Sequence, residues 1–75
     1  MKYYAIREKA TLRFVAVTDF SHGDGSCRQI FASPYHPPLL LCAERLGPEL
    51  KRRHIDLKRY EVIAVEIRKA EGGGL

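Results

Sequence analysis

The chain has 75 residues, of which 45% are hydrophobic and 29% charged, and a formal net charge of +4. This length leaves room for one domain with a small core, and the composition excludes a disordered chain. A bilayer-spanning helix needs about 20 apolar residues, far more than the longest apolar run, residues 39–43. The first residues contain no apolar stretch of signal-peptide length, so we expect a cytoplasmic protein with no membrane contact.

Two strands are expected at the start of the chain, at residues 2–8 and 12–18. Apolar and polar residues alternate in both, for example with Tyr4 and Ile6 on one side of the first strand. The short connector between them predicts a β-hairpin. Residues 27–32, entered from a glycine-rich loop, are expected to form a short third strand.

The loop "SHGDGSC", from Ser21 to Cys27, brings together residue types that occur in catalytic and metal sites. A catalytic triad needs a base held within hydrogen-bonding distance of the nucleophile, and two glycines make that rigidity hard to achieve. Asp24-Gly25 is instead typical of a turn. We therefore expect a surface loop, no catalytic residue, no cofactor and no enzymatic activity.

Zinc binding is the sharper alternative for this region, since two imidazoles and two thiols make up the donor count of a structural zinc site. The short Cys-x-x-Cys spacing that usually pairs the ligands is absent. Cys42 is explained more simply as a small buried apolar residue. The candidate ligands are His22, Cys27, His36 and Cys42.

A helix is expected after the proline-rich connector 33–38. Gly47-Pro48 interrupts the helical pattern, and a proline inside a helix costs about 3 kcal/mol. A short turn over 42–46 followed by a helix from Pro48 to His54 is therefore preferred, with one kinked helix as the second possibility. His54 would lie at the C-terminal end, where the helix dipole favours it.

The segment 59–69 is the clearest predicted strand, with Ile63 and Val65 on one face and Val62 and Ala64 on the other. The expected fold is α+β, with three to four antiparallel strands and one helix on one face of the sheet. Residues 1–70 would form a single domain and residues 71–75 a flexible tail. One helix cannot cover both apolar faces of the sheet, so the open face would bind a second copy or another partner.

The net charge is concentrated in one segment. Residues 45–59 contain six basic and two acidic residues, and the rest of the chain is neutral. This segment is either a solvated helix face or a binding patch for phosphates or an acidic protein surface. Aromatic rings at Tyr3, Tyr4, Phe14 and Tyr60 would assist a nucleic acid if the sheet face is open. The candidate contacts are Arg45, Lys51, Arg52, Arg53, Lys58 and Arg59.

Three stretches, "YYAIREK" (3–9), "PLLL" (38–41) and "YEVIAVEI" (60–67), give the chain a pattern that resembles small accessory proteins of phages and prophages. The chain departs from that pattern at Ala10-Thr11 and Gly47-Pro48, so no site residue is transferred. The resemblance implies a non-enzymatic protein in the cytoplasm of a bacterial host cell. Such a protein would inhibit a host complex, for example a ribonucleoprotein, as anti-CRISPR proteins do. A nucleic-acid-binding module and a zinc-stabilised regulator are the alternatives.

Overall fold

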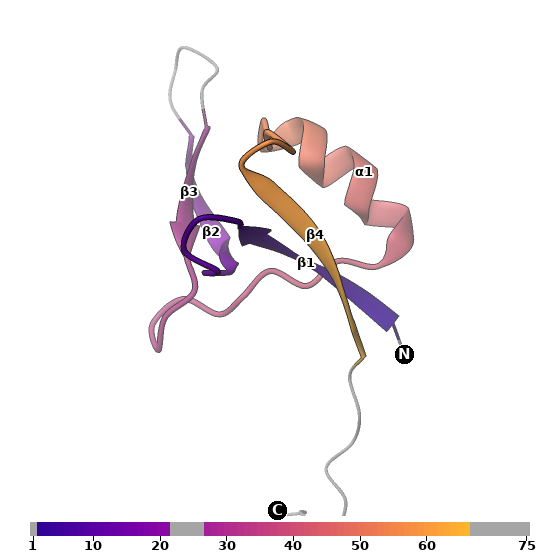
Figure 1. Ribbon diagram of the computed structural model, residues 1–75, viewed down its shortest axis with the longest axis horizontal. Helices are drawn as coiled ribbons and strands as arrows, with labels where there is room; N and C mark the ends of the chain where they lie inside the picture. Colours follow the sequence, from indigo (N-terminus) through magenta and orange to yellow (C-terminus); the bar gives the residue numbers. More distant parts are fainter. Residues whose placement is uncertain (1, 22–26, 67–75) are drawn as a thin grey trace, which may run out of the picture.

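Residues 2–21 and 27–66 are described by the computed structural model of the chain (Figure 1). The predicted tail 71–75 lies outside these residues, and so does most of the predicted Ser21–Cys27 loop. The elements, in chain order, are β1 (Lys2–Glu8), β2 (Val15–Ser21), β3 (Cys27–Phe31), α1 (Ala43–Arg52) and β4 (Tyr60–Glu66). The α+β class and the single helix are confirmed.

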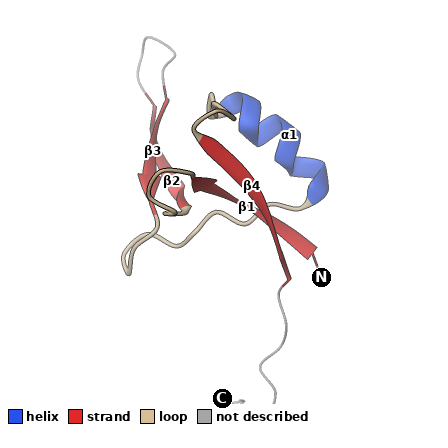
Figure 2. Ribbon diagram, in the orientation of Figure 1, coloured by secondary structure: helices blue, strands red, loops and turns tan. Residues whose placement is uncertain are grey.

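The strands form two antiparallel pairs rather than one sheet, β1 with β4 and β2 with β3 (Figure 2). The predicted hairpin of the first two strands is therefore wrong. Instead of a ladder, the predicted strands share one isolated bridge, between Arg7 and Phe14, beside a hydrogen bond of 2.9 Å from the Glu8 N–H to the Arg13 carbonyl. Strand β1 pairs along its whole length with β4, which offers an equally long apolar strand.

The extended segment 37–41 connects the two strand pairs through its backbone. The Leu41 N–H donates to the Tyr4 carbonyl at 2.8 Å, and the Tyr4 N–H donates to the Leu41 carbonyl at 2.7 Å. On the other side, the Leu39 N–H donates to the Val15 carbonyl at 2.9 Å, and the Val17 N–H donates to Pro37. This segment therefore acts as an irregular strand between the two pairs.

Helix α1 is continuous from Ala43 to Arg52 and contains Pro48, so the preferred prediction of a turn followed by a later helix is wrong. Pro48 removes one backbone donor. The carbonyl that loses this donor is that of Glu44, an exposed residue, so water can take the donor's place.

The C-terminal end of α1 is closed by a Schellman motif, which favours a left-handed residue after the cap. His54 occupies that position with φ of 55°, and its N–H donates to the Lys51 carbonyl at 3.2 Å. The Ile55 N–H then donates to the Leu50 carbonyl at 3.0 Å. The prediction that His54 lies at the helix end is confirmed, and the cap geometry explains its position.

The core lies between α1 and one face of the β1–β4 pair. Ile6, Val15, Leu39 and Leu41 are its buried residues, and side chains of the helix, of the chain that follows it and of β4 pack against them: Leu46, Leu50, Ile55 and Tyr60. Ile6 of β1 faces this core, and side chains alternate along a strand. The odd-numbered residues of β1 and β4 therefore lie on the opposite face, which α1 does not cover.

Candidate binding surface

An apolar groove of about 260 Å³ lies on the face of the β1–β4 pair that α1 does not cover. All of its lining side chains are apolar. Ala5 forms part of its wall and is almost fully buried, whereas Leu40 remains 40% exposed. Strands β1 and β4, the residue before β2 and the connecting segment 37–41 contribute to it, so it is built from parts of the chain that are far apart in sequence. The lining residues are Ala5, Phe14, Pro38, Leu40 and Val65.

A cationic side chain lies over the ring of Phe14, which lines this groove. The Arg7 guanidinium lies 6.0 Å from the centre of the Phe14 ring and forms an ion pair of 2.7 Å with Glu61. The Arg13 guanidinium lies 4.5 Å from the centre of the Phe31 ring, within the usual range for a cation–π contact. The groove therefore combines apolar lining side chains with the Arg7–Glu61 ion pair next to Phe14.

Arg53, a predicted partner contact, is buried inside the protein with only 2% of its side chain exposed. Its Nε donates to Glu49 at 3.1 Å and its Nη1 to the Gln29 side chain at 2.9 Å. Nη1 also donates to the Ala16 carbonyl at 3.3 Å, and Nη2 donates to the Val17 carbonyl. This corrects the prediction for Arg53, whose donors connect the end of α1 to β2 and β3.

Arg52 is exposed, but its charge is also paired within the chain. It contacts Asp19 at 2.9 Å and Glu49 at 3.1 Å. Hydrogen bonds from Arg52 are the main cause that lowers the pKa of Glu49, and Arg53 adds to the effect. Asp19 also lies 3.6 Å from Arg53, so two carboxylates balance two guanidinium groups.

The other predicted basic contacts remain at the surface. Arg45, Lys51 and Lys58 are exposed and form no ion pair among residues 2–21 and 27–66. Arg59 is 70% exposed and lies 3.9 Å from Glu8. The basic surface is thus smaller than the sequence count indicates, because Asp19 and Glu49 neutralise its central part.

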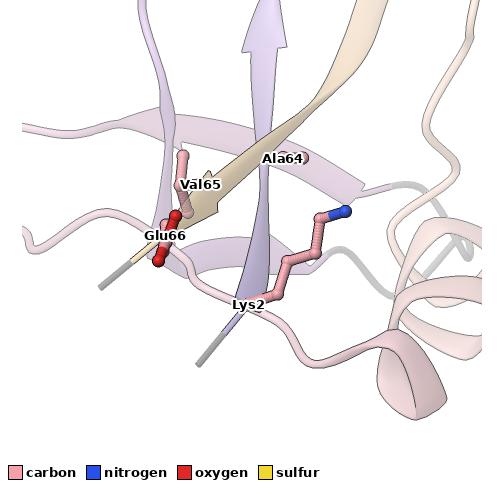
Figure 3. A pocket seen from close by; sticks show the side chains of 4 residues that line it. All are labelled: Lys2, Ala64, Val65 and Glu66. Atoms are coloured by element: carbon pink, nitrogen blue, oxygen red, sulfur yellow. The ribbon is translucent and has the colours of Figure 1, made fainter. Parts of the chain in front are cut away.

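Two further cavities are less suited to an apolar ligand. One lies between α1 and β2, has a volume of about 390 Å³, and includes Arg45, Glu49 and Arg52 among its lining residues. The other, also about 390 Å³, lies at the open end of the β1–β4 pair and is lined by Lys2, Ala64, Val65 and Glu66 (Figure 3). There the Lys2 side chain extends away from Val65 and Glu66.

Of the four candidate zinc ligands, the structure describes the side chains of His36 and Cys42 alone. His22 and the side chain of Cys27 lie outside the described residues. His36 belongs to a tight turn in which its N–H donates to the Ser33 carbonyl, whereas Cys42 is the N-cap residue of α1. Within the described part of the chain, no three His, Cys, Asp or Glu residues are grouped so that they could hold a metal ion.

The aromatic residues predicted to assist a nucleic acid are divided between the two faces. Phe14 lines the groove, whereas Tyr60 packs against the core. Burial is the main cause that raises the pKa of Tyr60.

The groove could not be recognised from the sequence, because Phe14, Pro38 and Val65 are far apart in the chain.

Over residues 2–21 and 27–66, no helix has the length and apolarity that crossing a bilayer requires. In comparisons with known proteins, no family model, no curated protein and no solved structure matches the chain. Its function therefore has to be inferred from its own surfaces.

Proposed function

We propose that the chain is a non-enzymatic module that binds another protein through the apolar groove. The observation that carries the proposal is that five apolar side chains form a groove that α1 does not cover, with the Arg7–Glu61 ion pair next to Phe14. Apolar contacts at the centre and polar groups at the rim are the usual arrangement of a protein-binding surface. The matching partner would insert an apolar side chain into the groove and place polar groups opposite the Arg7–Glu61 ion pair.

A protein partner is favoured over a nucleic acid for two reasons. Phosphate binding depends on available cations, and the guanidinium groups of Arg52 and Arg53 are already engaged by Asp19 and Glu49. The groove, moreover, offers no donor side chain for a phosphate. Nucleic-acid binding through Arg45, Lys51, Lys58 and Arg59 is the second candidate, supported by the net charge of +4.

The resemblance to phage accessory proteins extends the proposal to the kind of partner. The chain would act by covering a surface of a host complex, so inhibition would require binding but no chemistry. A groove with an apolar floor suits this role, because burial of apolar area supplies affinity and the rim charges select the partner.

The test is a binding experiment with three variants. Leu40→Asp places a charge in the groove, and Leu57→Asp is the matched control at an exposed residue (57%) that does not line it. Arg45→Glu combined with Lys51→Glu reverses the exposed charge on α1. Tagged proteins would be used to capture partners from bacterial extracts treated with nuclease, and a captured protein would then be purified and its affinity measured by calorimetry.

The proposal expects Leu40→Asp to weaken that affinity at least about tenfold, equivalent to 1.4 kcal/mol, while Leu57→Asp binds like the unmodified chain. Equal affinity of Leu40→Asp and the unmodified chain would contradict the groove as the contact. Fluorescence anisotropy with labelled DNA and RNA tests the second candidate. Tight binding that weakens steeply with salt and is lost in the charge-reversed variant would favour it instead.

A further inference from the structure

Strand β4 lies at the edge of its strand pair. It pairs with β1 over seven residues, from Lys2 opposite Glu66 to Glu8 opposite Tyr60. Among the described residues, no strand or isolated bridge pairs with its other edge. Figure 1 shows β4 in front of β1, with no other described element over it.

This edge has few of the features that prevent edge-to-edge pairing. Natural edge strands are usually short, bulged, or interrupted by proline or lysine. Strand β4 pairs in regular register without a bulge, and residues 62–65 are four consecutive apolar residues, Val-Ile-Ala-Val. Its only charged residues are Glu61 near one end and Glu66 at the other.

The size of the core favours a second copy as the occupant. A pair of strands alone is marginally stable, and the buried apolar residues of the described chain are few and include two alanines: Ala5, Ile6, Val15, Ala16, Leu39 and Leu41. Chains of this length often gain the missing burial by association. Pairing of two β4 strands would join the two β1–β4 pairs into one four-stranded sheet.

The sequence of β4 selects one register for this pairing. A two-fold axis perpendicular to the sheet places the same face of both copies on the same side. Because side chains alternate between the faces, an odd-numbered residue of one β4 must then lie opposite an odd-numbered residue of the other. A pairing centred on Ile63 matches all seven residues of β4 with all seven of the second copy. In this register Glu61 lies opposite Val65 and Glu66 opposite Tyr60, so no like charges face each other.

We propose that the protein forms a two-fold dimer through antiparallel β4–β4 pairing centred on Ile63. Val65 lines the groove and lies on the odd-numbered face with Ile63. The dimer therefore presents two grooves on the same side of one sheet, flanking an apolar strip of Ile63 and Val65 from both copies. The inference concerns self-association and does not depend on the proposed function.

Disulfide trapping tests the register directly. In the proposed pairing the two Ile63 Cα atoms are about 4.5–5.5 Å apart, which suits a disulfide. The two Val65 Cα atoms are offset by four residues, about 14 Å along the strand. With Cys27 and Cys42 replaced by serine, Ile63→Cys should form a covalent dimer under mild oxidation and Val65→Cys should not.

Other trapping results would overturn the proposal. Preferential trapping of Val65→Cys would show a different register, and equal trapping of both variants would show random collision. No trapping of a variant that retains the circular-dichroism spectrum of the folded protein would also contradict the pairing.

Sedimentation provides a second, independent measurement on the unmodified chain. Its mass should be twice the 8.6 kDa of one copy. Ile63→Lys places two like charges at the axis and should give the single-copy mass, while Val17→Lys, at an exposed residue away from β4, should remain dimeric. A single-copy mass for the unmodified chain at high concentration would overturn the dimer and leave the groove proposal intact.

Discussion

Arg53 follows the last residue of α1, and its guanidinium lies among acceptors from the helix and both strands of the other pair. Glu49, Gln29 and the carbonyls of Ala16 and Val17 all accept from it. The Gln29 side chain in turn donates to the Arg53 carbonyl at 3.0 Å. A buried arginine is tolerated only when its donors are satisfied in this way. Arg53 therefore stabilises the position of α1 relative to the β2–β3 pair.

Replacement of Arg53 is expected to destabilise the protein strongly. Arg53→Ala leaves the Ala16 and Val17 carbonyls without this donor, and each unsatisfied buried group typically costs about 1–3 kcal/mol. Arg53→Lys should recover only part of the loss, because an ammonium group cannot reproduce the planar fork of donors. Urea unfolding followed by circular dichroism measures both. The control Lys51→Ala, at an exposed helix residue, should change the free energy of unfolding by less than about 0.5 kcal/mol.

Acid should destabilise the same network. Hydrogen bonds from Arg52 lower the pKa of Glu49 below its ordinary value of 4.5, so the folded state binds fewer protons than the unfolded state in acid. The contribution is fully present above the ordinary pKa and is lost as the pH falls through and below it. The urea concentration at the unfolding midpoint should therefore decrease as the pH is lowered from about 6 to about 3. The variant Glu49→Gln should show a weaker dependence, and an equal slope in both proteins would contradict the assignment.

Helix α1 shows how tertiary contacts override local sequence signals. Gly47-Pro48 predicts an interruption, but the helix runs through it because Leu46 and Leu50, on either side, both pack against the core. Burial of these side chains offsets the cost of the proline. The sequence correctly predicted the third and last strands and the end of the helix, where the signals are local. It could not predict that β1 pairs with a strand near the other end of the chain.

Gly47 offers a direct way to stabilise the helix. Apart from its chain neighbours and the adjacent helix backbone, no atom lies within 4 Å of a Cβ added at this residue, so Gly47→Ala meets no side chain from the rest of the fold. Alanine should raise the free energy of unfolding by about 0.5–1 kcal/mol, because glycine loses more conformational freedom in a helix. Thermal unfolding should show the gain as a higher Tm. An unchanged or lower Tm would show that the helix is strained at Gly47-Pro48.

At the scale of the whole molecule, charge counted along the sequence differs from charge available at the surface. Six basic residues in one segment predicted one continuous patch, but Asp19, which lies 33 residues before Arg52, neutralises part of it. Such long-range pairing cannot be read from local composition. The same holds for the groove, whose residues come from both ends and the middle of the chain. The sequence did predict that one sheet face would remain apolar and uncovered by the helix, and the groove lies on that face.

The pairing of β1 with β4 also constrains when the protein can fold during its synthesis. Lys2 faces Glu66, so the edge of β1 that pairs with β4 stays unpaired until β4, more than 50 residues later in the chain, has been synthesised. Contacts of such wide separation form slowly, since a long loop must close first. During translation the early apolar strand is therefore exposed to chaperones and proteases, and cooperative folding has to wait until β4 has been released from the exit tunnel.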